Sequence, residues 1–271
     1  MTLKLMGVFA HPDDESLGVG GALAKYASEG VEVSLVTATR GQRGRFRGHR
    51  DPPEHPGEQA LAAIRERELR AAADVLGVTD LTILDYVDLD LDRAQPGEII
   101  GRLAQELRRV RPHVVVTFGP DGAYGHPDHV AISQFTSAAV AVAAAEPGSG
   151  SHQSERPHAI DKFYFMAWPQ SVWDAYQAAF RVLASQVDGV TRQAVPWPDW
   201  AITTWVDSRA HWQQVWQAVS CHESQVTAYE RLRDLSAEHH EALWGWQTFY
   251  RVFSRVNGGR AREADLFEGL R

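Results

Sequence analysis

The amino-acid sequence predicts an α/β sandwich with a mainly parallel β-sheet. Apolar runs typical of buried strands alternate with segments of helical periodicity through residue 145. The first forty residues alone contain a strand, a helix and a second strand. Such a βαβ unit makes its two strands parallel, with the crossover helix covering one face of the sheet.

The first unit occupies residues 3–39. Residues 3–10 form a short apolar run and are expected to be a buried strand. Residues 17–30 space their apolar side chains as a helix does, and Gly30 is a natural C-terminal cap. Residues 31–39 are β-branched and apolar, which predicts a second strand.

A long loop separates this unit from the next elements. Residues 40–57 carry five arginines among glycines and prolines, and loops of this length in a compact domain are usually functional or disordered. Residues 58–76 are predicted to be a helix, and residues 81–84 a third strand. An acidic loop at residues 85–92 follows.

The alternation continues towards the C-terminus. We expect an amphipathic helix at residues 99–110, a very hydrophobic strand at 114–118 and an alanine-rich helix at 130–145. Residues 146–158 are rich in Gly, Ser and Pro and predict a flexible excursion before a strand at 160–168. The last hundred residues hold eight of the nine tryptophans, in helices and short strands.

Composition narrows the class of protein. With 271 residues and 44% hydrophobic content, the chain can bury a full core, and we expect one domain. Residues 1–145 would form its α/β core, and residues 146–271 would complete the sheet and the ligand cleft. The net charge of −8 argues against nucleic-acid binding, and no apolar run reaches the ~20 residues that span a bilayer. The single cysteine, Cys221, excludes an internal disulfide and fits a cytoplasmic protein.

Two short motifs of similar composition follow predicted strands. They are His11-Pro12-Asp13-Asp14-Glu15 and His126-Pro127-Asp128-His129. Ligands of open α/β sheets bind beyond the carboxyl ends of the strands, where both motifs lie. A catalytic zinc takes three His, Asp or Glu ligands and keeps a fourth position for water. The motifs offer more than three, so spacing alone does not separate ligands from helpers; the candidates are His11, Asp13, Asp14, His126, Asp128 and His129.

Either motif alone has a structural alternative. An aspartate at a helix start accepts backbone N–H bonds, so a His-Pro-Asp turn can simply cap a helix. The occurrence of two such motifs, each after a buried strand, favours a metal site over two unrelated caps.

With these motifs the chain resembles the PIG-L/LmbE-like deacetylase family, which includes the mycothiol- and bacillithiol-pathway deacetylases. The matching text is Ala10 to Glu15 with Gly20-Gly21 behind it, and Tyr124-Gly-His-Pro-Asp-His129. Weaker matches are an R-x-x-E-L helix at residues 65–69 and His222-Glu-Ser-Gln225. The resemblance covers residues 5–145 well and the rest loosely. It implies a Rossmann-like three-layer sandwich with a C-terminal extension.

The resemblance also implies roles at the site. The ligands correspond to His11, Asp14 and His129, with zinc as the metal and iron(II) as an alternative, since two histidines and an aspartate suit both. Asp13 matches the general base that activates water and then protonates the leaving amine. Three helpers complete the set: His126 and Tyr124 match groups that stabilise the oxyanion, and Asp128 matches the carboxylate that orients His126.

Arg65 and Asp88 correspond to positions that hold the sugar in family members. Their structural alternatives are a helix-surface pair of Arg65 with Glu68 and a simple turn role for Asp88. The turn Gly41-Gln42-Arg43-Gly44 lacks the glutamate that many relatives carry. The arginines that follow either recognise an anionic group on the substrate or form a solvated loop.

The function expected from the resemblance is zinc-dependent removal of the acetyl group from an N-acetylglucosamine-type amino sugar. One alternative is a same-family amidase acting on a thiol conjugate or an antibiotic precursor. Another is a metal-free sugar- or nucleotide-binding module that uses the same crevice. The expected partner is a small-molecule substrate, with no nucleic acid or membrane; homo-oligomers are common among relatives.

Overall fold

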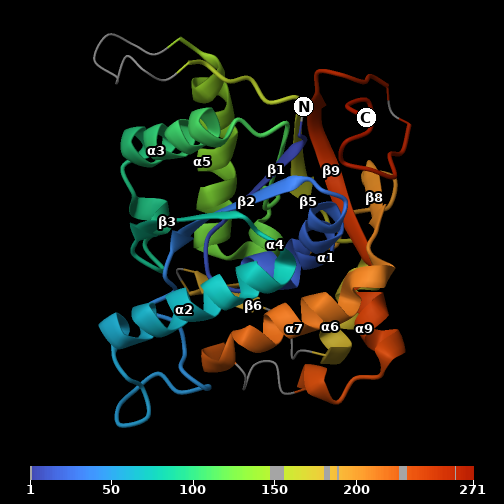
Figure 1. The fold of residues 1–271 in the computed structure, drawn as a ribbon. Helices are drawn as coiled ribbons and strands as arrows, with labels where there is room; N and C mark the ends of the chain where they lie inside the picture. Colours follow the sequence, from blue (N-terminus) through green and yellow to red (C-terminus); the bar gives the residue numbers. More distant parts are fainter. Residues whose placement is uncertain (1, 147–155, 180–183, 188, 226–230, 260) are drawn as a thin grey trace.

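The computed structural model describes residues 2–146, 156–179, 184–187, 189–225, 231–259 and 261–271 (Figure 1). Its main-sheet strands are β1 (Lys4–Phe9), β2 (Glu32–Thr39), β3 (Asp80–Tyr86), β4 (Val114–Thr117), β5 (Lys162–Met166), β8 (Thr204–Asp207) and β9 (Trp246–Ser254). They are ordered β3-β2-β1-β4-β5-β9-β8. The first five are parallel, whereas β9 is antiparallel to both β5 and β8. The predicted α/β class with a mainly parallel sheet is confirmed.

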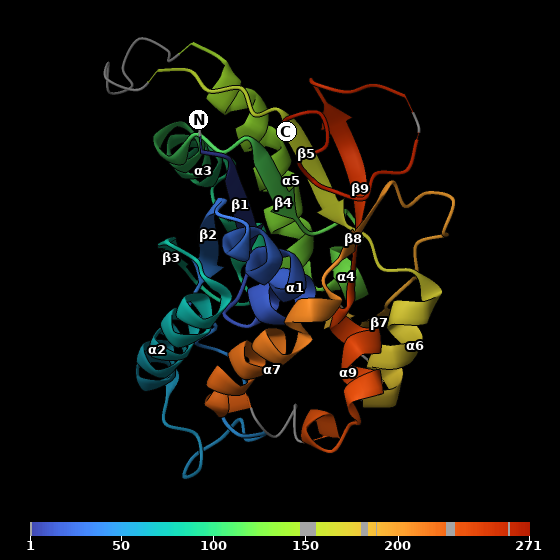
Figure 2. The ribbon, with the colours of Figure 1, turned by 45° about the vertical axis from the view of Figure 1, so that its right-hand side comes forward.

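Helices cover both faces of this sheet. In the described ranges they are α1 (Asp14–Ser28), α2 (Glu58–Leu76), α3 (Pro96–Val110), α4 (Gly122–Gly125), α5 (Pro127–Ala144), α6 (Gln170–Ala179), α7 (Trp212–Cys221) and α9 (Ala237–Trp244). α3 and α5 pack together on one face, and α1, α2 and α7 pack together on the other (Figure 1, Figure 2). None of the helices in these ranges is long and apolar enough to cross a membrane.

The central strands explain the strongest sequence signals. All four residues of β4 are buried, and β1 is buried from Leu5 onward. A parallel strand covered on both faces reads as a continuous apolar run rather than an alternating one. This is the pattern that predicted both strands.

Three helices begin earlier than the periodicity predicts. α1 starts at Asp14 rather than residue 17, α3 at Pro96 rather than 99, and α5 at Pro127 rather than 130. Acidic residues and proline are favoured in a first helical turn, although they add nothing to the apolar pattern. Residues of both motifs therefore belong to helix N-termini, where the backbone fixes their side chains.

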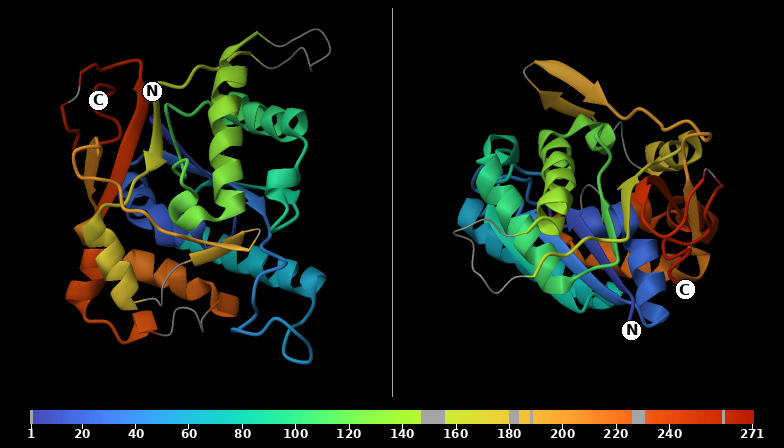
Figure 3. Two further views of the ribbon diagram at one scale, coloured as in Figure 1. Left: turned by 180° about the vertical axis from the view of Figure 1, so that it is seen from behind. Right: turned by 90° about the horizontal axis from the view of Figure 1, so that it is seen from above.

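The strand order brings the two motifs together. β1 and β4 are adjacent, with Leu5 opposite Val114 and Gly7 opposite Val116, so the chain leaves both strands at the same edge. A separate hairpin of β6 (Ala184–Val187) and β7 (Val190–Gln193) lies beside α4 at this edge (Figure 3). The Ser185 hydroxyl on the hairpin donates to the Gly125 carbonyl at 2.8 Å.

Candidate metal centre

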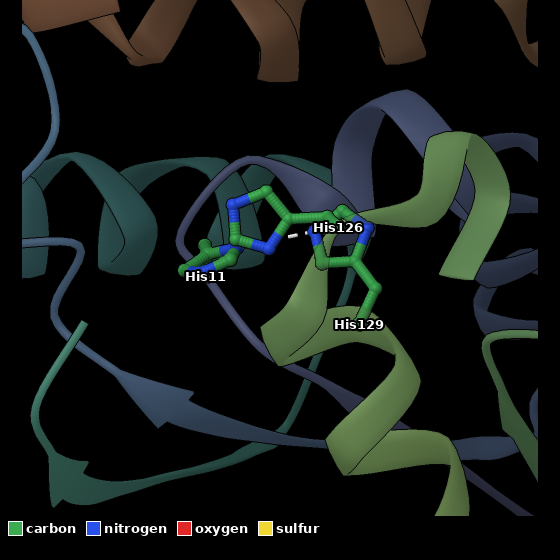
Figure 4. Close-up of side chains that lie close together, drawn as sticks. All are labelled: His11, His126 and His129. Atoms are coloured by element: carbon green, nitrogen blue, oxygen red, sulfur yellow. Dashed lines mark hydrogen bonds between the residues drawn. The ribbon is translucent and has the colours of Figure 1, made fainter. Parts of the chain in front are cut away.

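Three side chains that can bind a metal meet at the carboxyl edge of the sheet. His11 follows β1, Asp14 begins α1, and His129 lies in the first turn of α5. The Nδ1 atom of His11 lies 3.2 Å from the Nε2 atom of His129. The Asp14 carboxylate brings one oxygen to 3.6 Å from His11 Nδ1 and the other to 3.3 Å from His129 Nε2. Figure 4 shows the imidazoles of His11 and His129 gathered with that of His126.

This spacing fits a tetrahedral metal ion. Donor atoms about 2.0–2.1 Å from zinc stand roughly 3.3–3.4 Å from one another in a tetrahedron. The two imidazole nitrogens lie 3.2 Å apart, and each lies 3.3 to 3.6 Å from a different oxygen of the Asp14 carboxylate. Two imidazole nitrogens and a carboxylate are also the donors that a catalytic zinc takes.

A ring stack and hydrogen bonds hold His129 and Asp14 in place. His129 stacks on Phe118 with ring centroids 3.9 Å apart, and its Nδ1 atom lies 3.3 Å from the Gly122 carbonyl oxygen. One Asp14 oxygen accepts the backbone N–H of His11 at 2.8 Å. Such contacts fix the tautomer and ring plane of a metal-binding histidine.

The second nitrogen of His11 faces two buried carboxylates. Its Nε2 atom lies 3.0 Å from Asp128 Oδ2 and 3.1 Å from Asp88 Oδ1. Asp128 also accepts the backbone N–H of Leu89 at 2.7 Å. The resemblance implied that Asp128 orients His126, but within the described chain its carboxylate orients His11. Among the described hydrogen bonds, Asp128 meets His126 through its backbone N–H, at 3.2 Å from Nδ1, while its carboxylate meets His11 and the backbone N–H groups of Leu89 and Leu91.

Two other triplets of described residues bring potential ligand atoms within 4.8 Å of one another. They are His11, His126 and His129, and His11, Asp88 and Asp128. In the second triplet the carboxylates already pair with His11 Nε2. In the first, one His126 nitrogen already accepts a backbone N–H. The set with Asp14 fits better, because its carboxylate contacts both histidines.

The electrostatics of the centre favour a positive charge. Burial alone would lower the pKa of His11, but hydrogen bonds to Asp128, Asp14 and Asp88 raise it well above its usual value. For Asp14, burial would raise the pKa, but His129 and His11 lower it well below the usual range. A cation placed among these groups therefore needs little further compensation.

His126 and Tyr124 border the three candidate ligands. The His126 ring lies 4.8 Å from that of His11 and 4.6 Å from that of His129, centroid to centroid. Burial and these two histidines lower the pKa of His126 to about 3, so its ring is neutral at pH 7. Since Nδ1 accepts the Asp128 N–H, the neutral ring carries its proton on Nε2 and can donate it. The Tyr124 ring lies 5.9 Å from that of His126.

Asp13, the predicted base, caps the N-terminus of α1 with φ at 104°. Aspartate tolerates this left-handed backbone better than most residues. Arg65 is 5% exposed and donates to Asp13 Oδ2 at 3.2 Å and to the backbone carbonyls of Pro12 and Gly41. Because 16% of the Asp13 side chain stays exposed, it can still meet a substrate.

Arg65 and Asp88 are both buried and hydrogen-bonded within the chain. Arg65 is buried rather than on the helix surface, and Glu68 accepts hydrogen bonds from Ser224. Asp88 is 3% exposed and accepts the backbone N–H of Arg43 at 3.0 Å. These contacts favour positioning of Asp13 and His11 over direct contact with a sugar.

The arginine-rich loop is partly paired with acids of its own chain. Arg40 binds Glu66 and Asp85, and Arg43 binds Asp90. The remaining three arginines, Arg45, Arg47 and Arg50, are exposed. An anion-binding role for this loop would fall to those three.

The sequence prediction assigned no role to one pair of buried, hydrogen-bonded side chains beside the site. Glu15 and His222 are both fully buried, and His222 Nε2 lies 2.9 Å from Glu15 Oε1. Burial would lower the pKa of His222, but the Glu15 carboxylate raises it overall. The available signal was that both residues stand in stretches that matched the family, Ala10 to Glu15 and His222-Glu-Ser-Gln225. Its partner lies 207 residues away, so the sequence alone could not supply it.

Gly41 has φ of +60°, and a β-carbon there would collide with the Arg65 guanidinium. We expect Gly41→Ala to cost about 1–3 kcal/mol of unfolding free energy and to lower turnover, since Arg65 must leave Asp13. Gly101→Ala is the matched control, because open space surrounds Gly101 within α3. It should stabilise by about 0.5–1 kcal/mol in urea denaturation. Equal stability of the two variants would contradict this packing.

The fold and the site together define a class: an α/β protein with a mainly parallel sheet and, at the carboxyl edge of that sheet, two histidines and an aspartate that could hold a metal. Residues 6–140 match the PIG-L family model, described as GlcNAc-PI de-N-acetylase. A 1D-myo-inositol 2-acetamido-2-deoxy-alpha-D-glucopyranoside deacetylase of Kineococcus radiotolerans is 34% identical over 308 residues, covering 98% of this chain and 83% of the relative. The chain belongs to the PIG-L family, as its motifs implied.

Solved structures share the fold at lower identity. The N,N'-diacetylchitobiose deacetylase of Pyrococcus horikoshii superposes with a TM-score of 0.66 at 22% identity, over 92% of this chain and 83% of that one. The 4-carboxy-2-hydroxymuconate hydratase GalB of Pseudomonas putida superposes with a TM-score of 0.69 at 22% identity, over 96% and 100%. Because the two have different activities, the fold alone does not assign a reaction.

Proposed function

We propose that the protein is a zinc-dependent hydrolase that removes the acetyl group from an N-acetylglucosamine-type amino sugar. The observation that carries this proposal is the convergence of His11, Asp14 and His129 beside the Arg65-held carboxylate of Asp13. The deacetylase name of the 34%-identical relative supports the choice of an amino sugar. Iron(II) is the alternative metal, because the same donors suit both ions.

Different residues of the chain carry out the successive steps of amide hydrolysis. His11, Asp14 and His129 would hold a zinc ion, which would supply Lewis acidity to water and to the amide carbonyl. Asp13 accepts a proton as a water oxygen forms its bond to the acyl carbon. The same carboxyl then gives that proton to the nitrogen as the C–N bond breaks, which releases acetate and the free amine.

The oxyanion formed during attack needs a hydrogen-bond donor. His126 meets this need in its neutral form, with the proton on Nε2. Tyr124 has a pKa raised by burial, so its phenol also stays protonated and can donate. Asp128 and Asp88 act one step removed, by fixing the ring of His11.

Acetate release from zinc-loaded protein tests the proposal. The panel contains an N-acetylglucosaminyl-inositol, N,N'-diacetylchitobiose, an N-acylated glycopeptide and a cysteinyl amide conjugate. We expect acetate from at least one N-acetyl sugar, loss of that activity with a chelator, and its return on adding zinc. An anaerobic iron(II) arm compares the two metals.

The panel also separates the rival functions. Cleavage of only the cysteinyl amide or the glycopeptide would identify a same-family amidase with another substrate. Sugar binding by calorimetry that a chelator leaves unchanged, with no acetate from any compound, would identify a metal-free binding module and overturn the proposal.

A further inference from the structure

The Glu15 carboxylate joins the catalytic turn to a distant segment of the chain. Its Oε2 atom accepts the backbone N–H of Asp13 at 3.0 Å, and its Oε1 atom accepts from the Ser16 hydroxyl at 2.6 Å. Oε1 also contacts His222 Nε2 at 2.9 Å. His222 follows α7, so the pair ties the start of α1 to the end of α7.

This contact matters because the Asp13 backbone is not in a relaxed conformation. A non-glycine residue at φ 104° costs of order 1–3 kcal/mol and persists only when its surroundings fix it. Three groups do so here: Glu15 holds the N–H, the Leu17 N–H holds the carbonyl at 3.0 Å, and Arg65 holds the side chain. Glu15 is in turn oriented by His222.

The segment after His222 also braces the helix that carries Arg65. In η3 (Glu223–Gln225), the Ser224 backbone N–H and hydroxyl donate to the two Glu68 oxygens at 2.7 and 2.6 Å. Glu68 and Arg65 are one turn apart on α2. Residues 222–224 therefore contact Glu15 on α1 and Glu68 on α2, the two helices that carry the hydrogen-bond partners of Asp13.

Burying the ionisable side chains of Glu15 and His222 costs free energy, so stabilising the fold is a poor explanation for the pair. His222 is fully buried, and its Nδ1 atom has no hydrogen-bond partner among the described residues. Apolar side chains of similar volume commonly replace a buried ion pair with no loss of stability. The contact with His222 instead fixes the orientation of the Glu15 carboxylate, which a pair of apolar side chains could not do.

We propose that His222 is a positioning residue which, through Glu15, holds the backbone of Asp13 in the conformation that makes its carboxylate the catalytic base. The proposal rests on the proposed function for the role of Asp13. It concerns kcat and not metal or substrate binding, since neither His222 nor Glu15 contacts the three ligand side chains through a described hydrogen bond.

The experiment compares His222→Ala with His240→Ala in the zinc-loaded, full-length protein. His240 is a matched control: it is 4% exposed, bonds through Nε2 to the Leu232 carbonyl at 2.6 Å, and also leaves Nδ1 without a described partner. We expect His222→Ala to lower kcat by roughly 10- to 100-fold with KM and zinc content unchanged. His240→Ala should keep kcat even if it melts at a lower temperature. His222→Gln, which can still donate to Glu15, should recover most of the lost rate.

A second readout is independent of catalysis. Amide hydrogen exchange resolved at Asp13 should be faster in His222→Ala than in wild type, and unchanged in His240→Ala. Equal kcat in His222→Ala and His240→Ala, or unchanged exchange at Asp13, would overturn the positioning role. If wild type releases no acetate from any sugar, the proposed function fails, and the exchange measurement still decides whether His222 holds Asp13.

Discussion

Asp13→Asn is expected to lower kcat by roughly 10²–10⁴-fold while the protein keeps its full zinc content. Asparagine preserves the shape of the side chain but cannot take the proton of the attacking water. Asp13 is not among the three ligands, so its loss leaves the metal donors intact. Acetate release and elemental analysis of the same preparation measure the two quantities together.

Asp265→Asn is the matched control for Asp13→Asn. Asp265 is also an arginine-paired aspartate, with Oδ2 at 2.7 Å from Arg271, and it lies near the C-terminus. It should lose some stability but no kcat. Near-normal turnover in Asp13→Asn would show that another group is the base.

His129→Ala and His126→Ala should separate metal binding from oxyanion stabilisation. The two rings are stacked neighbours, with centroids 4.6 Å apart. We expect His129→Ala to lose zinc and activity together, because it removes one of three ligands. His126→Ala should keep zinc and lose roughly 10²–10³-fold in kcat, the usual effect of removing an oxyanion donor.

Thermal unfolding with and without a chelator also separates metal binding from oxyanion stabilisation, and it needs no substrate. Bound metal stabilises the folded state, so chelation should lower the Tm of wild type and His126→Ala. It should leave the Tm of His129→Ala unchanged. A chelator-sensitive Tm in His129→Ala would show that His129 is not a ligand. Loss of zinc from His126→Ala would instead move the metal to the set of His11, His126 and His129.

The sequence predicted the parallel core because its signals are local. The run of valines in β4 and the 58–76 helix depend on neighbouring residues alone, and the structure places α2 at Glu58–Leu76. The antiparallel pairing of β9 with β5 and β8 was not predicted from the sequence. Strand β9 mixes buried, half-buried and exposed residues and pairs with β5 across the intervening residues 167–245, so only tertiary contacts specify its direction.

The motifs named candidate site residues that the structure brings together, but not how these residues pair. Aspartate carries no local indication of which histidine it will face, and Asp128 orients His11, 117 residues away. Arg65 reaches Asp13 across 52 residues and Glu15 meets His222 across 207. Such contacts follow from the packing of α1 against α2 and α7, which helical periodicity does not encode.

The most direct test of this account is an anomalous difference map, collected at the zinc edge, from crystals of the zinc-loaded protein. We expect one strong peak bonded to His11 Nδ1, His129 Nε2 and the Asp14 carboxylate, about 2.0–2.2 Å from each. A peak bonded to His126 in place of Asp14, or no peak within reach of these histidines, would contradict the metal centre proposed here.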